Sequence, residues 1–140
     1  MKILFAADGS QFTKRVLFYL GSHTQWLDPT HEYTVLHCVL KVPHRAGIFE
    51  RLAVVRGLYE DDAESVLRPI RAFFDDHGIT AKFVYEIGKP AEHIAALAES
   101  GRFDLLIMGS RGLGTVAGFL FRSVVTRVLS SCTTPILLVR

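Results

Sequence analysis

Residues 104–140 read DLLIMGSRGLGTVAGFLFRSVVTRVLSSCTTPILLVR, and this last quarter of the chain decides the fold. An apolar run, Leu105 to Met108, is followed by glycines and then by a helical pattern that carries Ser123. Glycine permits positive φ angles and a close approach of the backbone to a ligand. The N–H groups at a helix start lack partners and, together with the helix dipole, attract anions. The segment is therefore typical of a strand that leads into a phosphate-binding loop and a helix.

The start of the chain supplies a second strand end of this kind. Lys2 to Ala7 is an apolar run that ends in Asp8-Gly9-Ser10. An acidic side chain at one strand end and a glycine-lined turn at another indicate a crevice for a nucleotide. Asp8 also has a simpler interpretation, because Asp and Ser side chains both cap helix starts, and a helical pattern follows Ser10.

Strand and helix patterns alternate along the whole chain. Five apolar runs rich in Val, Ile, Leu, Phe and Tyr predict strands at Lys2–Ala7, Tyr33–Val39, Ala81–Ile87, Leu105–Met108 and Ile136–Val139. The helical patterns between them predict right-handed crossovers and helices on both faces of a parallel sheet. We therefore predict the α/β class, as a three-layer α/β/α, Rossmann-like fold with a five-stranded parallel sheet, and we take the strand order of this sheet to be 3-2-1-4-5. In such sheets ligands bind where the winding order reverses, here between the strands that end at Asp8 and Gly109.

Capping residues and periodicity predict the helix positions. Pro90 suits the first turn of the third helix, and Gly101 suits its end. The last helix is expected to bury one face, made of Val124, Val128 and Leu129. Between residues 41 and 60 the pattern is mixed, since proline and glycine indicate a loop while apolar spacing favours an early helix start. The acidic run at residues 60–62 predicts a solvated helix start.

Composition sets bounds on the partners. The 140 residues suit a single domain, residues 1–140, and 49% hydrophobic with 21% charged residues predicts a compact fold. The net charge of +2 comes from interleaved charges without a basic stripe, so a nucleic-acid partner is not expected. The sequence has no run of about 18 apolar residues, and its N-terminus does not resemble a secretory signal. We expect a cytoplasmic protein that binds neither nucleic acid nor membrane.

Several catalytic motifs are absent from the sequence. A P-loop would need a lysine where Thr115 stands, and a dinucleotide fingerprint would need a glycine where Ala117 stands. The chain has no Gly-x-Ser-x-Gly elbow and no His-Glu-x-x-His pair, and Cys38 and Cys132 lack the spacing of zinc ligands. We therefore expect no catalytic residues and no metal-ligating side chains, and at most slow ATP hydrolysis.

Four segments resemble the universal stress protein family, and together they span nearly the whole chain. ILFAADGS at residues 3–10 resembles the first strand with its terminal acid, TVLHCV at residues 34–39 the second strand, and GKPAEHI at residues 88–94 the opening of the third helix. The most specific match is to Gly-x-x-Gly, nine residues, then Gly-Ser or Gly-Thr, which ATP-binding members carry. Gly109 and Gly112 match the first two glycines, and Arg122-Ser123 occupies the last pair.

The resemblance implies an adenine-nucleotide alpha hydrolase-like fold and a set of site residues. Asp8 and Cys38 are expected near the adenine or ribose, Gly109 and Gly112 along the phosphates, and Ser123 on a phosphate or ribose oxygen. The expected site is completed by Ala7, Met108, Arg111, Arg122 and Val124. The resemblance further implies ATP, with Mg²⁺ as its companion ion. It also implies a homodimer through the C-terminal strand Ile136–Val139, a short apolar edge of the kind that pairs with another chain.

Arg122 leaves two functions open. Its side chain stands where a glycine would let the backbone approach a phosphate, which favours loss of binding. A guanidinium that faces the site would instead hold a phosphate through two hydrogen bonds, and Arg111 would assist it. The first hypothesis is a dimeric, ATP-binding switch in the stress response without efficient catalysis. The alternative is a dimeric stress-associated scaffold that binds no ATP because Arg122 replaces the motif glycine.

Overall fold

The computed structural model describes residues 1–41, 52–111 and 124–140. Within these ranges a single sheet is formed by five strands: β1 (Lys2–Ala7), β2 (Glu32–Val39), β3 (Ala81–Ile87), β4 (Leu105–Gly109) and β5 (Ile136–Val139). Each pair of neighbours is parallel, and the strand order is β3-β2-β1-β4-β5. The predicted sheet order 3-2-1-4-5 is therefore confirmed, and the predicted strand ends agree with the structure to within one residue.

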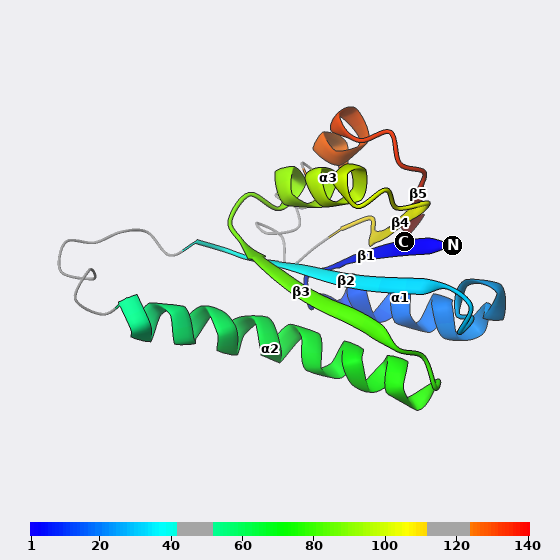
Figure 1. Ribbon diagram of the computed structural model, residues 1–140, viewed down its shortest axis with the longest axis horizontal. Coiled ribbons are helices and arrows are strands. Elements are labelled where there is room, and N and C mark those ends of the chain that lie inside the picture. Colours follow the sequence, from blue (N-terminus) through cyan, green and yellow to red (C-terminus); the bar gives the residue numbers. More distant parts are fainter. Residues whose placement is uncertain (42–51, 112–123) are drawn as a thin grey trace.

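Helices cover both faces of this sheet (Figure 1). The helices α1 (Gln11–Ser22) and α2 (Leu52–Asp76) lie on one face, and a 3-10 turn, η1 (Thr24–Trp26), follows α1. On the other face lie α3 (Pro90–Ser100) and a helix at residues 124–131, which we call the C-terminal helix. The predicted three-layer arrangement is confirmed. None of the described helices combines the length and the apolar character that a membrane crossing requires.

Two apolar clusters join the three layers, and β1 contributes to both of them. Ile3 and Phe5 pack with residues of α1 and α2, whereas Leu4 and Ala6 pack with residues of α3 and the C-terminal helix. Successive side chains of a strand point to opposite faces, so a strand covered on both faces needs an unbroken apolar run. Every residue of β4 is likewise buried, which is why the two strands nearest the centre of the sheet were readable from sequence.

The helix ends agree with the predicted caps. The Ser10 hydroxyl oxygen accepts a hydrogen bond from the backbone N–H of Phe12 at 3.1 Å, so Ser10 is the N-cap of α1. Pro90 occupies the first turn of α3, and Gly101 is its C-cap. Such caps use side chains and backbone within a few residues of the helix end, so local sequence is enough to predict them.

Two helix predictions were wrong. The acidic run at residues 60–62 lies inside α2, because that helix begins already at Leu52. In the C-terminal helix, Val124, Val125 and Val128 are buried, whereas Leu129 is 54% exposed. At about 100° per residue, Leu129 lies beyond the edge of the arc that these three valines define. The sheet covers a narrower stripe of the helix than the apolar pattern suggested.

Glu99, near the end of α3, holds the turn that leads into β5. Its Oε1 atom accepts hydrogen bonds from the backbone N–H and from the hydroxyl of Thr133. These two hydrogen bonds, the backbone one first, lower the pKa of Glu99 below its ordinary value of 4.5. A carboxylate whose pKa is lowered in the folded state stabilises the fold above its unfolded-state pKa. This contribution is lost as the pH falls through the folded-state pKa.

We predict that Glu99→Gln lowers the melting temperature at pH 7 and that this difference shrinks when the pH falls below about 4.5. The amide keeps an acceptor for Thr133 but removes the charge that strengthens both hydrogen bonds. Thermal denaturation of both proteins from pH 7 downward measures the effect. Glu60→Gln, on the exposed surface of α2, is the control. A difference in melting temperature that stays constant across the acidic range would contradict the assignment of these hydrogen bonds to the Glu99 carboxylate.

Candidate functional site

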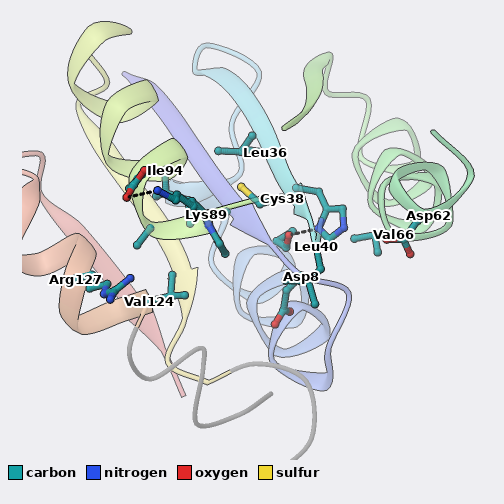
Figure 2. A pocket seen from close by; sticks show the side chains of 16 residues that line it. Asp8, Leu36, Cys38, Leu40, Asp62, Val66, Lys89, Ile94, Val124 and Arg127 are labelled. Carbon is teal, nitrogen blue, oxygen red and sulfur yellow. Dashed lines mark hydrogen bonds and ion pairs between the residues drawn. The ribbon is translucent and has the colours of Figure 1, made fainter. Parts of the chain in front are cut away.

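A cavity of about 350 Å³ opens at the C-terminal ends of β1 and β2 (Figure 2). Its volume lies within the range of small-ligand sites, at the lower end. The first turn of α3, one side of α2 and the C-terminal helix also line the cavity. The prediction placed the crevice between β1 and β4. The cavity lined by the described residues extends from β1 toward β2, α3 and the C-terminal helix.

The floor of the cavity is apolar. Leu36 and Cys38 are two residues apart on β2, so both side chains point to the α3 face, where they meet Ile94 and Val124. Burial, with a smaller effect of the nearby Glu86 carboxylate, raises the pKa of the Cys38 thiol to about 12. The thiol is therefore uncharged at neutral pH. The floor suits a flat apolar group.

A histidine closes the floor on the side of α2. His37 is 6% exposed, and its Nδ1 atom donates a hydrogen bond to the carbonyl oxygen of Ala7 at 2.8 Å. The bond ties together the ends of β1 and β2, which are neighbours in the sheet register. The imidazole thus satisfies a backbone carbonyl at a point where the ladder of the two strands ends.

Asp8 follows β1 and is held in place by the start of α1. Its Oδ1 atom accepts hydrogen bonds from the Ser10 backbone N–H and from the Thr13 hydroxyl, each at 3.0 Å. The Thr13 oxygen in turn accepts from the backbone N–H groups of Asp8 and Gly9, at 3.2 and 3.1 Å. Oδ1 thus holds the turn before α1, whereas the helix cap itself is Ser10. Among the described residues, none hydrogen-bonds to Oδ2, and Asp8 lines the cavity.

Gly9 allows this turn to fit under α2. Its φ angle is +78°, a conformation that side chains disfavour. A Cβ atom at this position would also lie 2.9 Å from the Cγ2 atom of Val66, which lines the cavity from α2. The glycine therefore brings the Asp8 turn and the α2 wall of the cavity together.

Charged side chains surround the opening of the cavity. Lys89 and Glu92 come from the start of α3 and form an ion pair of 3.6 Å between Nζ and Oε1. Arg127 comes from the C-terminal helix, and Asp62 comes from α2. Sequence reasoning missed all four of these residues. Two signals were available, since Lys89 is the variable residue of Gly-x-Pro and Arg127 stands four positions after Ser123 in the sequence.

The structure brings together part of the predicted site. Ala7, Asp8, Cys38 and Val124 line the cavity. Met108 is fully buried in the cluster beneath α3 and does not reach the described cavity.

The remaining predicted residues have other surroundings or fall outside the described ranges. Gly109 packs against the start of α1, and Arg111 is exposed. Gly112, Arg122 and Ser123 lie outside the described residues.

The chemistry that the cavity offers is recognition of a partly apolar, polar-edged ligand. A flat apolar part of a ligand that lies on the floor is shielded from water. The rim offers a carboxylate oxygen and two cations to the polar groups of the ligand. Within residues 1–41, 52–111 and 124–140, His, Cys, Asp and Glu side chains form no cluster of three that could hold a metal ion.

Comparisons with known proteins agree with this fold. The model of the universal stress protein family matches residues 1–140. A Thermus aquaticus protein, named universal stress protein in the QAH/OAS sulfhydrylase 3′ region, is 33% identical over 142 residues, which cover 99% of this chain and 97% of that protein. Universal stress protein MJ0577 of Methanocaldococcus jannaschii is 30% identical over 80 residues. That match covers 57% of this chain and 49% of the relative.

Solved structures extend the likeness over the full fold. The MJ0577 structure has a TM-score of 0.77 at 25% identity and covers 99% of this chain and 94% of its own. A family protein from Arabidopsis thaliana with AMP bound has a TM-score of 0.70 at 17% identity, covering 99% and 90%. Two further family structures, one of them from Archaeoglobus fulgidus, are complexes with cAMP and with dAMP.

Proposed function

Because the chain belongs to the universal stress protein family, we propose that its cavity binds an adenine nucleotide and that the protein acts as a ligand-controlled, non-catalytic switch. The observation that carries the proposal is the pairing of an apolar floor with a preorganised carboxylate at its rim. The AMP, cAMP and dAMP complexes of family members support the ligand class.

In the proposed complex the adenine lies on the apolar floor, between Cys38 of β2 and Ile94 of α3. The ribose lies at the end of β1, where the Oδ2 atom of Asp8 accepts a hydrogen bond from a ribose hydroxyl. Because Ser10 and Thr13 already hold Oδ1, the carboxylate loses little freedom on binding. A base and a sugar are thus recognised by groups that are in place before the ligand arrives.

ATP with Mg²⁺ is the nucleotide that the chain's glycine motif favours. Mg²⁺ keeps several of its waters and commonly binds through substrate phosphates rather than through a complete set of protein ligands. The lack of a metal-ligating cluster among the described residues is compatible with that mode. Residues of the motif from Gly112 to Ser123 fall outside the described ranges, so their part in phosphate binding rests on the sequence alone.

We further propose that the switch is a dimer that pairs through β5. This strand lies at an edge of the sheet, beyond β4, and Leu138 within it is 37% exposed. An apolar edge strand with unpaired backbone groups is suited to pairing with a second copy of the chain. Nucleotide binding next to the C-terminal helix, which leads into β5, would then alter the surface that the dimer offers to partners.

We predict that isothermal titration of the chain with AMP and with Mg²⁺–ATP gives dissociation constants below about 1 mM, a free energy of at least about 4 kcal/mol. Binding to the folded state should also raise the melting temperature. GTP is the control for base recognition, and sedimentation of the same samples tests the dimer. If no nucleotide gives a heat of binding or a change in melting temperature, the alternative of a scaffold that binds no ATP is favoured.

A further inference from the structure

Among the described residues that line the cavity, both cations lie on one side of the sheet and two of the three carboxylates lie on the other. Lys89 and Arg127 belong to α3 and the C-terminal helix, which share one apolar cluster. Asp8 and Asp62 belong to the end of β1 and to α2, which packs on the other face. Figure 2 shows both basic side chains on the side of α3 and the C-terminal helix. A ligand with one anionic end would therefore bind in one orientation.

The backbone at Lys89 is strained in a way that is unusual for this residue. Its φ angle is +27°, and it follows Gly88 with φ of +82°. A residue other than glycine seldom adopts this region, and such outliers concentrate at functional sites. Lys89 precedes the first helical residue of α3, its side chain is 77% exposed, and it lines the opening of the cavity. The strained turn thus places a cation at that opening.

Arg127 is the second cation at the opening. It is exposed, and the ion pairs found among the described residues do not include it. Lys89, by contrast, is partly neutralised by Glu92, whose carboxylate also lines the cavity. The α3 side of the cavity therefore has two cations and one acid, an arrangement that leaves positive charge for an anionic ligand.

We infer that Lys89 and Arg127 bind the first phosphate of the nucleotide, the one attached to the ribose, and that Glu92 weakens this binding. The role of the pair rests on the proposed function of nucleotide binding. A guanidinium binds a phosphate through two parallel hydrogen bonds, and an ammonium acts as a point charge beside it. The pair thus selects nucleotides over nucleosides, and AMP and ATP share the group that it contacts.

Two substitutions of opposite effect test the pair by titration with AMP and with adenosine. Arg127→Gln should weaken AMP binding about tenfold and leave adenosine binding unchanged, because only AMP carries the phosphate. Glu92→Gln should strengthen AMP binding about threefold, because Lys89 loses its competing partner and the phosphate loses a repelling carboxylate. Lys14→Gln, which removes an exposed cation of α1 away from the cavity, is the matched control.

Salt provides an independent readout, since added NaCl should weaken AMP binding and leave adenosine binding nearly unchanged. Circular dichroism and melting temperature show whether each variant is folded. Equal affinities of the natural chain for AMP and adenosine would overturn the phosphate pair and leave nucleoside recognition standing. An Arg127→Gln variant that is folded and binds AMP as tightly as the natural chain would also overturn the phosphate pair. Failure of the natural chain to bind either ligand would instead remove the proposed function itself.

Discussion

Gly109→Val is expected to lower the free energy of unfolding by about 3 kcal/mol, the upper range for added volume in a packed core. A Cβ atom at Gly109 would lie 2.8 Å from the Cβ atom of Phe12 and 3.4 Å from its carbonyl carbon. The branched side chain of valine adds further atoms to a space that already lacks room for one. The chain has to move either the end of β4 or the start of α1.

Neither of these elements can move without losing other interactions. Gly109 pairs with Val139 of β5, and the next residue, Ser110, donates its backbone N–H to the Val139 carbonyl at 2.8 Å. On the other side, Phe12 is 7% exposed, and its backbone N–H is bound to the N-cap Ser10. The contact involves the Cβ atom and the backbone of Phe12, which a change of rotamer does not shift.

Urea denaturation of the natural chain and the variant measures this loss as a lower midpoint. Gly57→Ala is the matched control, because nothing lies within 4 Å of a Cβ atom at this position inside α2. It should raise the free energy of unfolding by up to about 1 kcal/mol, the helix propensity difference between the two residues. An unchanged midpoint for Gly109→Val would contradict the close packing of β4 on α1.

Asp8→Asn is expected to weaken AMP binding at least about tenfold in a variant that stays folded. The amide oxygen of asparagine can still accept the hydrogen bonds from Ser10 and Thr13, so the turn is retained. The free carboxylate oxygen becomes a neutral amide nitrogen. A hydrogen bond to a charged group contributes about 1.5–3 kcal/mol, which corresponds to this loss in affinity.

A ligand without ribose hydroxyls isolates the interaction. For the natural chain, 2′,3′-dideoxy-AMP should bind at least about tenfold more weakly than AMP, whereas Asp8→Asn should bind the two ligands alike. Asp28→Asn is the matched control, since Asp28 Oδ1 accepts from the Thr30 backbone N–H and hydroxyl in the same manner. Asp28 does not line the cavity. Retention of the full preference for AMP in Asp8→Asn would assign the ribose to another residue.

Gly109 illustrates how the structure can give a second reason for a residue that the sequence singled out. The sequence singled out this glycine as a place where backbone approaches a phosphate. In the structure the close approach is made by Phe12, a residue of α1 that lies about a hundred positions earlier. No local pattern predicts that contact, because it depends on how α1 crosses the end of β4.

The rim of the cavity likewise contains residues that the sequence predicted and residues that only the structure revealed. Asp8 and Cys38 were identified because Asp8 follows one recognisable strand and Cys38 lies near the end of another, at positions that the family resemblance marks. Asp62 and Arg127 were missed because each lies on a helix whose exposed residues look alike in sequence, and Lys89 was missed in the turn before α3. Which of these residues faces the cavity is set by the rotation and crossing of the helix over the sheet.

The sequence by itself determined the alternation of elements and the caps of α1 and α3. Burial on both faces demands unbroken apolar runs, and a cap uses atoms only a few residues away, so both leave a local record. Tertiary structure alone decided that α2 brings Asp62 to the cavity, that Leu129 faces outward and that Gly109 must admit Phe12. These features arise from packing between distant segments, where a side chain's surroundings depend on the position of whole helices.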